Sequence, residues 1–364
     1  MKILCFHPAL APYRVDFFNL LSRYAEFKIV FLQDNLLNQK FDQKELSRQL
    51  EASFEIWDGC KIKGQHLRFG LNRIIRRENP DVILGYESGI MAAQMILWKK
   101  LHPWRHVRLW TMLDDSPEQV RSRRGLRRTV RGWVMRNVEK VIVPSQAAAE
   151  AYAAKDRRFA SGLFSVVPII HDANSMRKNA REIYSLGKAW RRANCPETWN
   201  RVMLFVGRLA KEKNLHWLVE MMKDVADGFG LLIVGDGDER PSLVRQISEL
   251  ELDSRVRLVG RFEGDSLYGI ISASDVLVLP SMLEPFGAVV AEGLILGTPC
   301  LVSDRCGAAS LIEDGYNGCV FKCNDATSFK NAIMQLPQRT DHSMLKVDLE
   351  EAVKDLVSEG KMHD

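Results

Sequence analysis

The sequence has no apolar run as long as the roughly 18 residues that a membrane-spanning helix requires, and it contains no low-complexity tract. Its first residues, MKILCFHPAL, begin directly with a strand-like run and lack the apolar core of a secretory signal peptide. Hydrophobic residues make up 46% of the chain and charged residues 27%, which is the balance of an ordinary globular protein. We therefore expect a cytoplasmic protein without a transmembrane segment.

Paired cysteines are also missing. The seven cysteines include no CxxC pair, although four of them fall within residues 300–323. The segments TPCLVSD and GCVFKC, which carry most of these four, have the apolar pattern of strands. Reduced, buried thiols are therefore favoured over a structural zinc site.

Neither sign of charge dominates, since 51 lysines and arginines stand against 46 aspartates and glutamates. The positive charge is concentrated between Arg121 and Arg136, where seven arginines occur. The aromatic residues of this run do not interleave with the cations as a base-stacking surface requires. Nucleic acid is therefore not an expected partner.

Short apolar runs alternate with helical patterns along the whole chain, which predicts parallel sheets built from strand–helix–strand units. The strand candidates are KILCFHP, FKIVFLQ, DVILGY, VRLWTML, EKVIVPS and FSVVPII in the first half, and RVMLFVGRL, GLLIVGDG, RVRLVGR, SDVLVLPS, TPCLVSD and GCVFKC in the second. Ligands of such sheets bind at the carboxyl ends of strands. The turns that follow these runs are therefore where functional residues are expected.

At 364 residues the chain is longer than one hydrophobic core normally supports, so we expect two domains. The predicted architecture is α/β, with two Rossmann-like domains that face each other across a cleft. The first domain covers residues 1–171 and the second covers residues 201–340. Residues 172–200 form a poorly patterned linker region with one helix, and residues 341–364 form a closing helix.

Two cations follow the first strand of the second half, in the segment FVGRLAKEKNL. Gly207 permits a tight turn, and Arg208 and Lys213 bring positive charge to the end of the strand, which would suit a diphosphate. An ordinary surface loop with solvated cations is the alternative. The next strand ends in VGDGDER, where Gly235 belongs either to a nucleotide-binding turn or to a plain hairpin or helix-entry turn.

The segment LEPFGAVVAEGL places one glutamate at each end of an apolar run. Glu284 precedes a proline and is therefore biased towards an extended conformation outside the helix. Gly287 lets the backbone approach a ligand closely, and the free N–H groups of a helix that begins at Ala288 would attract an anion. Glu292 lies inside that helix, where its carboxylate would accept hydrogen bonds from a diol such as ribose. Pairing with an arginine or capping of a helix is the alternative for Glu292.

The motifs GRLAKEKN, VGDGDE, VGRF and E-P-F-G-x-x-x-x-E, in this order, resemble the C-terminal half of retaining glycosyltransferases with the GT-B fold. More narrowly, they resemble glycosyltransferase family four. The resemblance covers residues 201–335 through its motifs and most of the first half through strand order alone.

This resemblance implies a role for each motif. Arg208 and Lys213 would hold the diphosphate of a UDP- or GDP-linked sugar, while Glu284 would orient the transferred sugar as a positioning group. Glu292 would bind the ribose hydroxyls. The remaining donor-binding residues would be Gly207, Gly235, Arg261, Phe262, Phe286, Gly287, Ala288 and Val289, the last four through backbone N–H groups and Arg261 and Phe262 beside the nucleobase.

The implied reaction is retaining transfer of a hexose-type sugar, during which negative charge grows on the leaving diphosphate. Arg208, Lys213 and the helix start could stabilise that charge without a metal, and no Asp-x-Asp triplet stands in a suitable loop. The expected acceptor is a glycan or lipid-linked intermediate of bacterial surface polysaccharide synthesis. No cofactor is expected besides the nucleotide-sugar donor.

The first half is expected to carry the acceptor site. The segment HPALAPYRVDFF lacks the Gly-rich loop that the family often places there, and Arg14 is either an acceptor contact or part of a salt bridge on the helix surface. Tyr86 and Glu87, which follow DVILGY, are assigned to the acceptor pocket. Asp114, in WTMLDDSPE, is a candidate for acceptor binding or weak base catalysis. Alternatively, the residues after Asp114 simply begin a capped helix.

The arginine-rich run reads as one amphipathic helix. Its charged face would hold Arg121, Arg124, Arg128 and Arg131, and its apolar face Leu126, Val130, Trp133 and Val134. Such a helix either packs on the protein surface or docks on anionic lipid at the inner face of the membrane, where each arginine contributes about 1 kcal/mol.

Two further functions are compatible with these motifs. An epimerase acting on nucleotide sugars would need an acid pair flanking the sugar and no acceptor surface. A non-catalytic subunit that binds nucleotide sugars would not need all four of Arg208, Lys213, Glu284 and Glu292, so an enzyme is favoured.

Overall fold

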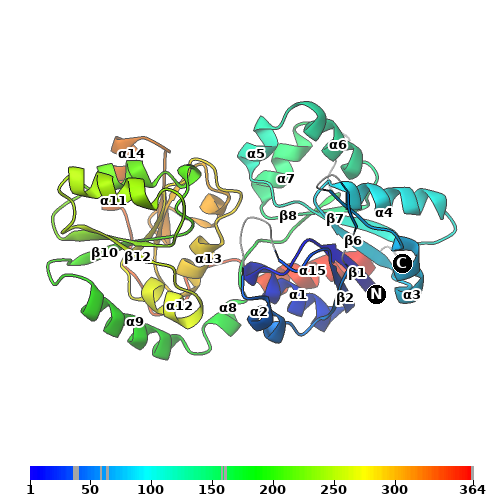
Figure 1. Cartoon of the computed structure of the whole chain (residues 1–364), viewed down its shortest axis with the longest axis horizontal. Coiled ribbons are helices and arrows are strands. Elements are labelled where there is room, and N and C mark those ends of the chain that lie inside the picture. Colours follow the sequence, from blue (N-terminus) through cyan, green and yellow to red (C-terminus); the bar gives the residue numbers. More distant parts are fainter. Residues whose placement is uncertain (36–40, 58–59, 63–64, 157–158, 160–161, 362–364) are drawn as a thin grey trace. The chain divides into compact units, whose positions relative to one another are not determined.

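The computed structural model describes residues 1–35, 41–57, 60–62, 65–156, 159 and 162–361 (Figure 1). The chain divides into two compact units. The first contains Met1–Asp172 together with Leu349–Asp364, and the second contains Ala173–Asp348. The second unit is therefore inserted into the first along the sequence.

The first unit is built on a seven-stranded sheet with the order β3-β2-β1-β6-β7-β8-β9, in which all neighbouring strands are parallel. These strands are β1 (Lys2–His7), β2 (Glu26–Phe31), β3 (Ser53–Ile56), β6 (Val82–Tyr86), β7 (Arg108–Met112), β8 (Lys140–Val143) and β9 (Phe164–Val166). A separate antiparallel pair is formed by β4 (Cys60–Ile62) and β5 (Gln65–Leu67). The helices are α1 (Pro12–Tyr24), α2 (Gln43–Gln49), α3 (Leu71–Glu78), α4 (Ile90–Leu101), α5 (Pro117–Ser122), α6 (Gly125–Met135), α7 (Gln146–Ala153) and α15 (Leu349–Lys361).

The second unit is built on a six-stranded parallel sheet with the order β12-β11-β10-β13-β14-β15. The strands are β10 (Arg201–Val206), β11 (Phe229–Val234), β12 (Val256–Gly260), β13 (Val276–Leu279), β14 (Cys300–Ser303) and β15 (Gly318–Phe321). The helices are α8 (Ala173–Met176), α9 (Ala180–Asn194), α10 (Leu215–Met221), α11 (Arg240–Glu249), α12 (Gly264–Ser272), α13 (Ala288–Ile295) and α14 (Ala326–Met334), with short 3₁₀ segments at η1 (Lys211–Lys213) and η2 (Gly307–Leu311).

The apolar runs of the sequence form the strands because parallel strands in the middle of a sheet are covered on both faces. Every residue of β13 and β14 is buried, without the alternation of a half-exposed strand. The predicted α/β class with two Rossmann-like parallel sheets is confirmed, and each predicted strand run overlaps an observed strand. The edge strand β3 and the β4–β5 pair were not predicted.

In both sheets the strand order reverses beside the first strand of the unit. β1 lies between β2 and β6, and β10 lies between β11 and β13. Doubly wound sheets bind ligands outside the carboxyl ends of the strands at this switch point. The turns that follow β1, β6, β10 and β13 are therefore the places in which each unit would build a site.

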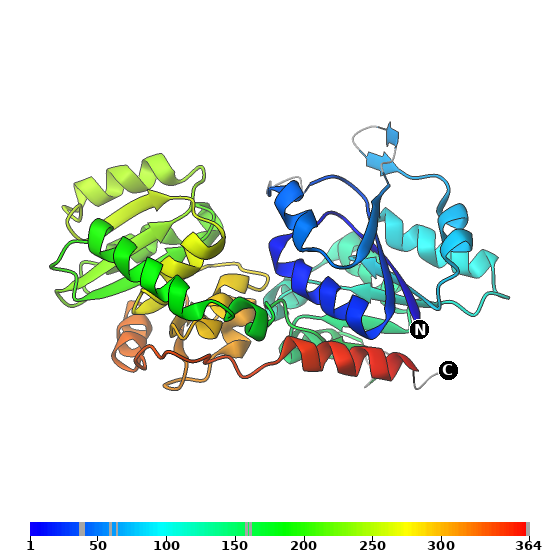
Figure 2. The same ribbon diagram turned by 90° about the horizontal axis from the view of Figure 1, so that it is seen from below.

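Residues 173–200, expected as most of a linker, belong to the second unit, and residues 349–364, expected as part of a closing helix, belong to the first. Residues 173–200 form α8 and α9 in the second unit, where α9 packs on α12. α15 packs on α1 in the first unit (Figure 2), and its Glu350 and Glu359 pair with Tyr24 and Lys140.

The arginine-rich run is not one helix, and the predicted division into two faces is wrong. α5 ends before Arg123, whose extended backbone separates it from α6. Arg131 is buried at 6% exposure, because the carboxylates of Asp115 and Glu87 bind its guanidinium. Leu126, expected on the packed face, is 78% exposed.

Candidate functional site

The candidate site of the second unit lies at the switch point of its sheet, where the turn after β10 meets the loop after β13. The Met282 N–H donates to the Glu212 carbonyl at 2.8 Å, which joins the two loops through their backbones. Lys213 and Glu284 form an ion pair, with their side chains only 16% and 12% exposed. The structure thus brings together two predicted residues that are 71 positions apart.

Arg208 lies on the rim of the same turn. Its side chain is 48% exposed and contacts Glu212 at 2.5 Å. The guanidinium therefore has a carboxylate partner on its own loop, and a bound anion would compete with Glu212 for it. The exposure leaves the side chain room to turn towards a ligand.

The glycines of the VGDGDER turn have a packing role. A Cβ atom added to Gly235 would lie 1.8 Å from the carbonyl oxygen of Gly207, so only glycine allows the turns after β10 and β11 to touch. The Leu209 N–H then donates to the Asp236 carbonyl at 2.9 Å. This packing accounts for Gly235 without a ligand, and it fixes the turn that carries Arg208.

The start of α13 is open to an anion. Gly287 caps the helix with a φ of 91°, and a Cβ atom there would lie 2.7 Å from Leu279, so the site requires glycine. Within the described residues, the backbone N–H groups of Phe286, Gly287, Ala288 and Val289 donate to no protein acceptor. The Gly307 N–H donates to the Glu284 carbonyl at 3.0 Å and holds the loop before the helix. Four donors and the positive end of the helix dipole are thus presented together.

The other predicted donor residues lie around this centre. Glu292 is partly buried on α13. Arg261 and Phe262 follow β12, two strands from β10 in the sheet. Arg261 pairs with Glu263, and the Phe262 ring packs edge-on against Trp190 at 5.6 Å.

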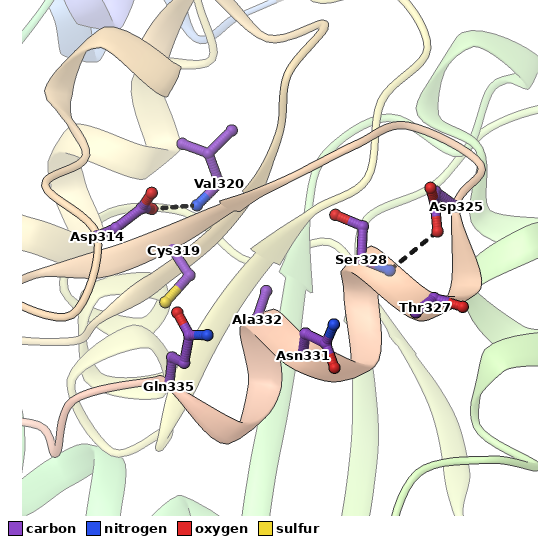
Figure 3. A pocket seen from close by; sticks show the side chains of 9 residues that line it. All are labelled: Asp314, Cys319, Val320, Asp325, Thr327, Ser328, Asn331, Ala332 and Gln335. Carbon is purple, nitrogen blue, oxygen red and sulfur yellow. Dashed lines mark hydrogen bonds between the residues drawn. The ribbon is translucent and has the colours of Figure 1, made fainter.

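A separate pocket of about 400 Å³ lies between β15 and α14 (Figure 3). Its two aspartates already accept hydrogen bonds from backbone N–H groups. Asp314 accepts from the Val320 N–H at 2.8 Å, and Asp325 caps α14 by accepting from the Ser328 N–H at 2.9 Å. Within the described residues, no group of three or more His, Cys, Asp or Glu side chains could hold a metal ion.

In the first unit, the turns after β1, β6 and β7 join in one polar cluster. Arg14, only 3% exposed, forms an ion pair with Asp114, and the Tyr86 hydroxyl donates to Asp114 at 2.9 Å. Burial alone would raise the pKa of Asp114, but the charge of Arg14 and the two hydrogen bonds outweigh it and hold this pKa below its usual value. Of the alternatives for Arg14, a salt bridge is present, but it is buried rather than on the helix surface.

His7 is a member of this cluster that the sequence interpretation missed. Its Nδ1 donates to the Ala9 carbonyl at 2.9 Å, which leaves Nε2 as an acceptor, and Nε2 is buried without a partner within the described residues. Burial and then the charge of Arg14 lower the pKa of His7 to about 3, so the ring is neutral. A polar residue at the end of the first strand was the signal that could have identified it.

Glu87 links this cluster to the arginine-rich segment. It has a left-handed backbone with a φ of 60°, and its carboxylate accepts from the Asp114 N–H at 3.2 Å and pairs with Arg131. Burial and then the neighbouring aspartates raise the pKa of Glu87, although Arg131 opposes this. The capped helix considered as the alternative after Asp114 is present, because Ser116 and Gln119 form a capping box at the start of α5.

Residues 188–346 match the family model described as glycosyl transferases group 1, which is less than half of the chain. The chain is 33% identical over 135 residues to the lipopolysaccharide core biosynthesis glycosyltransferase LpsE of Rhizobium meliloti, covering 37% of this chain and 39% of LpsE. It is 30% identical over 173 residues to the 2-deoxystreptamine glucosyltransferase of Streptomyces kanamyceticus, covering 47% of this chain and 44% of that protein. These matches thus span about two-fifths of the length of either relative.

Solved structures resemble the whole chain. Anabaena HepE in complex with UDP covers 98% of this chain and 95% of its own, with a TM-score of 0.71 and 21% identity. The lipopolysaccharide outer core galactosyltransferase WaaB covers 92% of this chain and 89% of its own, with a TM-score of 0.69 and 18% identity. The protein therefore has the GT-B fold, with two Rossmann-like parallel-sheet domains.

Proposed function

We propose that this chain is a glycosyltransferase that moves a hexose-type sugar from a UDP- or GDP-linked donor to a glycan or lipid-linked acceptor, with retention of the anomeric configuration. The observation that carries the proposal is the meeting of Lys213, Glu284 and the open start of α13 at the switch point of one sheet. The match to the glycosyl transferase family model, which spans all of these residues, supports it.

In this proposal the diphosphate binds the N–H groups at the start of α13 and the cations Lys213 and Arg208. Negative charge grows on the leaving diphosphate as the bond to the sugar breaks, so donors fixed in advance stabilise the transition state more than the ground state. Glu284 positions the transferred sugar, held in place by Lys213. Glu292 accepts hydrogen bonds from the ribose hydroxyls.

We assign the polar cluster of the first unit to the acceptor. Asp114 is a poor base because its pKa is held low and both carboxylate oxygens already accept hydrogen bonds. A positioning role therefore replaces the base role considered from the sequence. Arg14 and Tyr86 bind this carboxylate, and Glu87 accepts from the Asp114 backbone N–H. We propose an acceptor from bacterial surface polysaccharide synthesis, in line with relatives such as LpsE.

We also propose peripheral association with an anionic membrane through the arginine-rich segment. Arg124, Arg127 and Arg128 are exposed and have no ion-pair partner within the described chain, and Leu126 projects beside them. The described helices include none that is long and apolar enough to cross a membrane.

The activity is tested by incubating the full chain with a panel of nucleotide sugars and measuring nucleoside diphosphate release. Release that depends on an acceptor supports transfer, and an epimeric nucleotide sugar without release would identify an epimerase instead. Binding without turnover across donors and acceptors would favour a non-catalytic subunit. NMR of the product determines the anomeric configuration, and unchanged rates in EDTA are expected for the proposed metal-independent site.

A further inference from the structure

A second cavity, of about 510 Å³, lies in the first unit among α5, α6 and α7. The charged side chains that line it are Arg123, Arg128, Arg131, Arg136, Lys155 and Asp156. Five cations thus face one carboxylate, which is a strong excess of positive charge around one cavity. Neither the proposed donor site nor the acceptor cluster explains this excess.

Two carboxylates, those of Asp115 and Asp156, neutralise part of this positive charge. Arg123 and Arg131 contact Asp115 at 2.5 and 2.6 Å, and Asp115 is buried at 5% exposure. Arg136 lies 3.5 Å from Asp156. These contacts hold the guanidinium groups of the cavity wall in fixed positions rather than leaving them mobile in solvent.

Two cations of the wall have no carboxylate partner within the described residues. Arg128 makes no ion pair, and Lys155 donates only to backbone carbonyls of Val120, Arg121 and Arg123. Burial and then repulsion by Arg128 and its neighbouring arginines lower the pKa of Lys155. An anion in the cavity would relieve this repulsion.

Arg131 supplies an unused donor. Its two terminal nitrogens bind Asp115, Tyr152 and Glu87, whereas its Nε is buried without an acceptor within the described chain. A buried donor without a partner is uncommon in folded proteins and calls for an explanation. Arg131 lines the cavity, so this donor without an acceptor belongs to a residue of the cavity wall.

We propose that this cavity binds a phosphoryl group carried by an organic molecule. Guanidinium forks match the oxygens of a phosphate, and a lysine adds a compact charge. Val120, Met135 and Phe159 line the same cavity and offer an apolar wall to the rest of the molecule, and the volume is in the usual range of small-molecule sites. The source is either the headgroup of an anionic lipid or a water-soluble phosphate ester.

The first arm of the test measures pyrophosphate binding to the full chain by titration calorimetry at low salt. All proteins carry Lys213→Ala, so that the proposed donor site is weakened equally. Arg128→Gln removes a cation of the cavity wall, and Arg127→Gln removes the same charge from an exposed neighbour on α6 outside the wall. We expect Arg128→Gln to weaken binding by about tenfold or more, the effect of losing one charge-assisted contact, and Arg127→Gln to leave it nearly unchanged.

The second arm measures cosedimentation of the same proteins with phosphatidylcholine vesicles that contain phosphatidic acid. Non-specific adsorption falls equally in the two variants because they lose the same charge. A larger loss for Arg128→Gln in this arm identifies a lipid headgroup, and a larger loss with pyrophosphate alone identifies a soluble ester. Equal losses in the two variants, or no binding in either arm, would overturn the proposal. None of these outcomes depends on whether the chain transfers sugars.

Discussion

The ion pair between Lys213 and Glu284 allows stability and activity to be separated by mutation. Lys213→Met keeps most of the side-chain volume but removes the charge, so the Glu284 carboxylate loses its cation at 12% exposure. Glu284→Gln removes the opposite charge, and the double variant removes both. Lys211→Met is the matched control, because Lys211 is exposed on the same 3₁₀ turn.

The expected magnitudes follow from burial. Breaking a fully buried ion pair costs about 3–5 kcal/mol, and because both side chains keep some contact with water we expect about 2–3 kcal/mol for Lys213→Met. The double variant should cost less than about 1 kcal/mol, since no uncompensated charge remains. The resulting coupling energy is at least about 1 kcal/mol, as expected for residues in direct contact.

Activity should respond differently. Loss of one preorganised charge-stabilising group commonly lowers kcat by about 10²–10³, so both Lys213→Met and the double variant should be nearly inactive although the double variant is stable. Urea unfolding followed by circular dichroism measures stability, and nucleoside diphosphate release measures kcat. Turnover at the wild-type rate from Lys213→Met would refute the diphosphate assignment, and additive stability losses would refute the ion pair.

Three further predictions concern separate parts of the chain. Glu292→Ala should nearly abolish transfer while the circular dichroism spectrum stays that of the wild type, because the ribose loses its acceptor. Asp114→Asn should lower the free energy of unfolding at pH 7, and this difference should shrink only below about pH 4, since the stability from a carboxylate with a depressed pKa is lost as the pH falls from the ordinary aspartate pKa through the lower folded pKa. Changing Arg124, Arg127 and Arg128 to Glu should release the protein from vesicles of anionic lipid, as measured by cosedimentation.

Each of these predictions has a control and a contrary result. Glu292→Gln keeps the shape of the side chain, and full activity in Glu292→Ala would remove the ribose role. A stability difference for Asp114→Asn that does not shrink as the pH falls below about 4 would contradict the ion pair with Arg14. For the membrane, the same charge reversal at three exposed cations of α9, Arg181, Lys188 and Arg192, should leave cosedimentation unchanged.

The sequence alone predicted the parallel strands of both sheets and the two loops that carry Lys213 and Glu284. Continuous apolar runs such as those of β13 and β14 are typical of strands covered on both faces. The polar residues that follow β10 and β13 are brought together by the strand order. Short or partly exposed elements such as β3 and the β4–β5 pair have no comparable signal, because little of their surface is buried.

The first unit was harder to predict because its polar residues are buried in pairs. Helical periodicity places Arg131 on a charged face, but Asp115 and Glu87, which bind it, come from loops that precede α6 in the sequence. Arg14 is buried for the same kind of reason, because Asp114 binds it. The periodicity of polar and apolar residues does not reveal which distant carboxylate will bind a charged side chain and allow its burial.

The insertion of the second unit into the first has a practical consequence for dissecting the molecule. A fragment that stops at Asp172 would lack α15, and Tyr24, Lys140 and Ser165 would lose the glutamates that they bind there. An isolated first unit should instead join Asp172 to Leu349 through a short peptide. The second unit, whose two ends both connect to the first, could be excised as one uninterrupted piece.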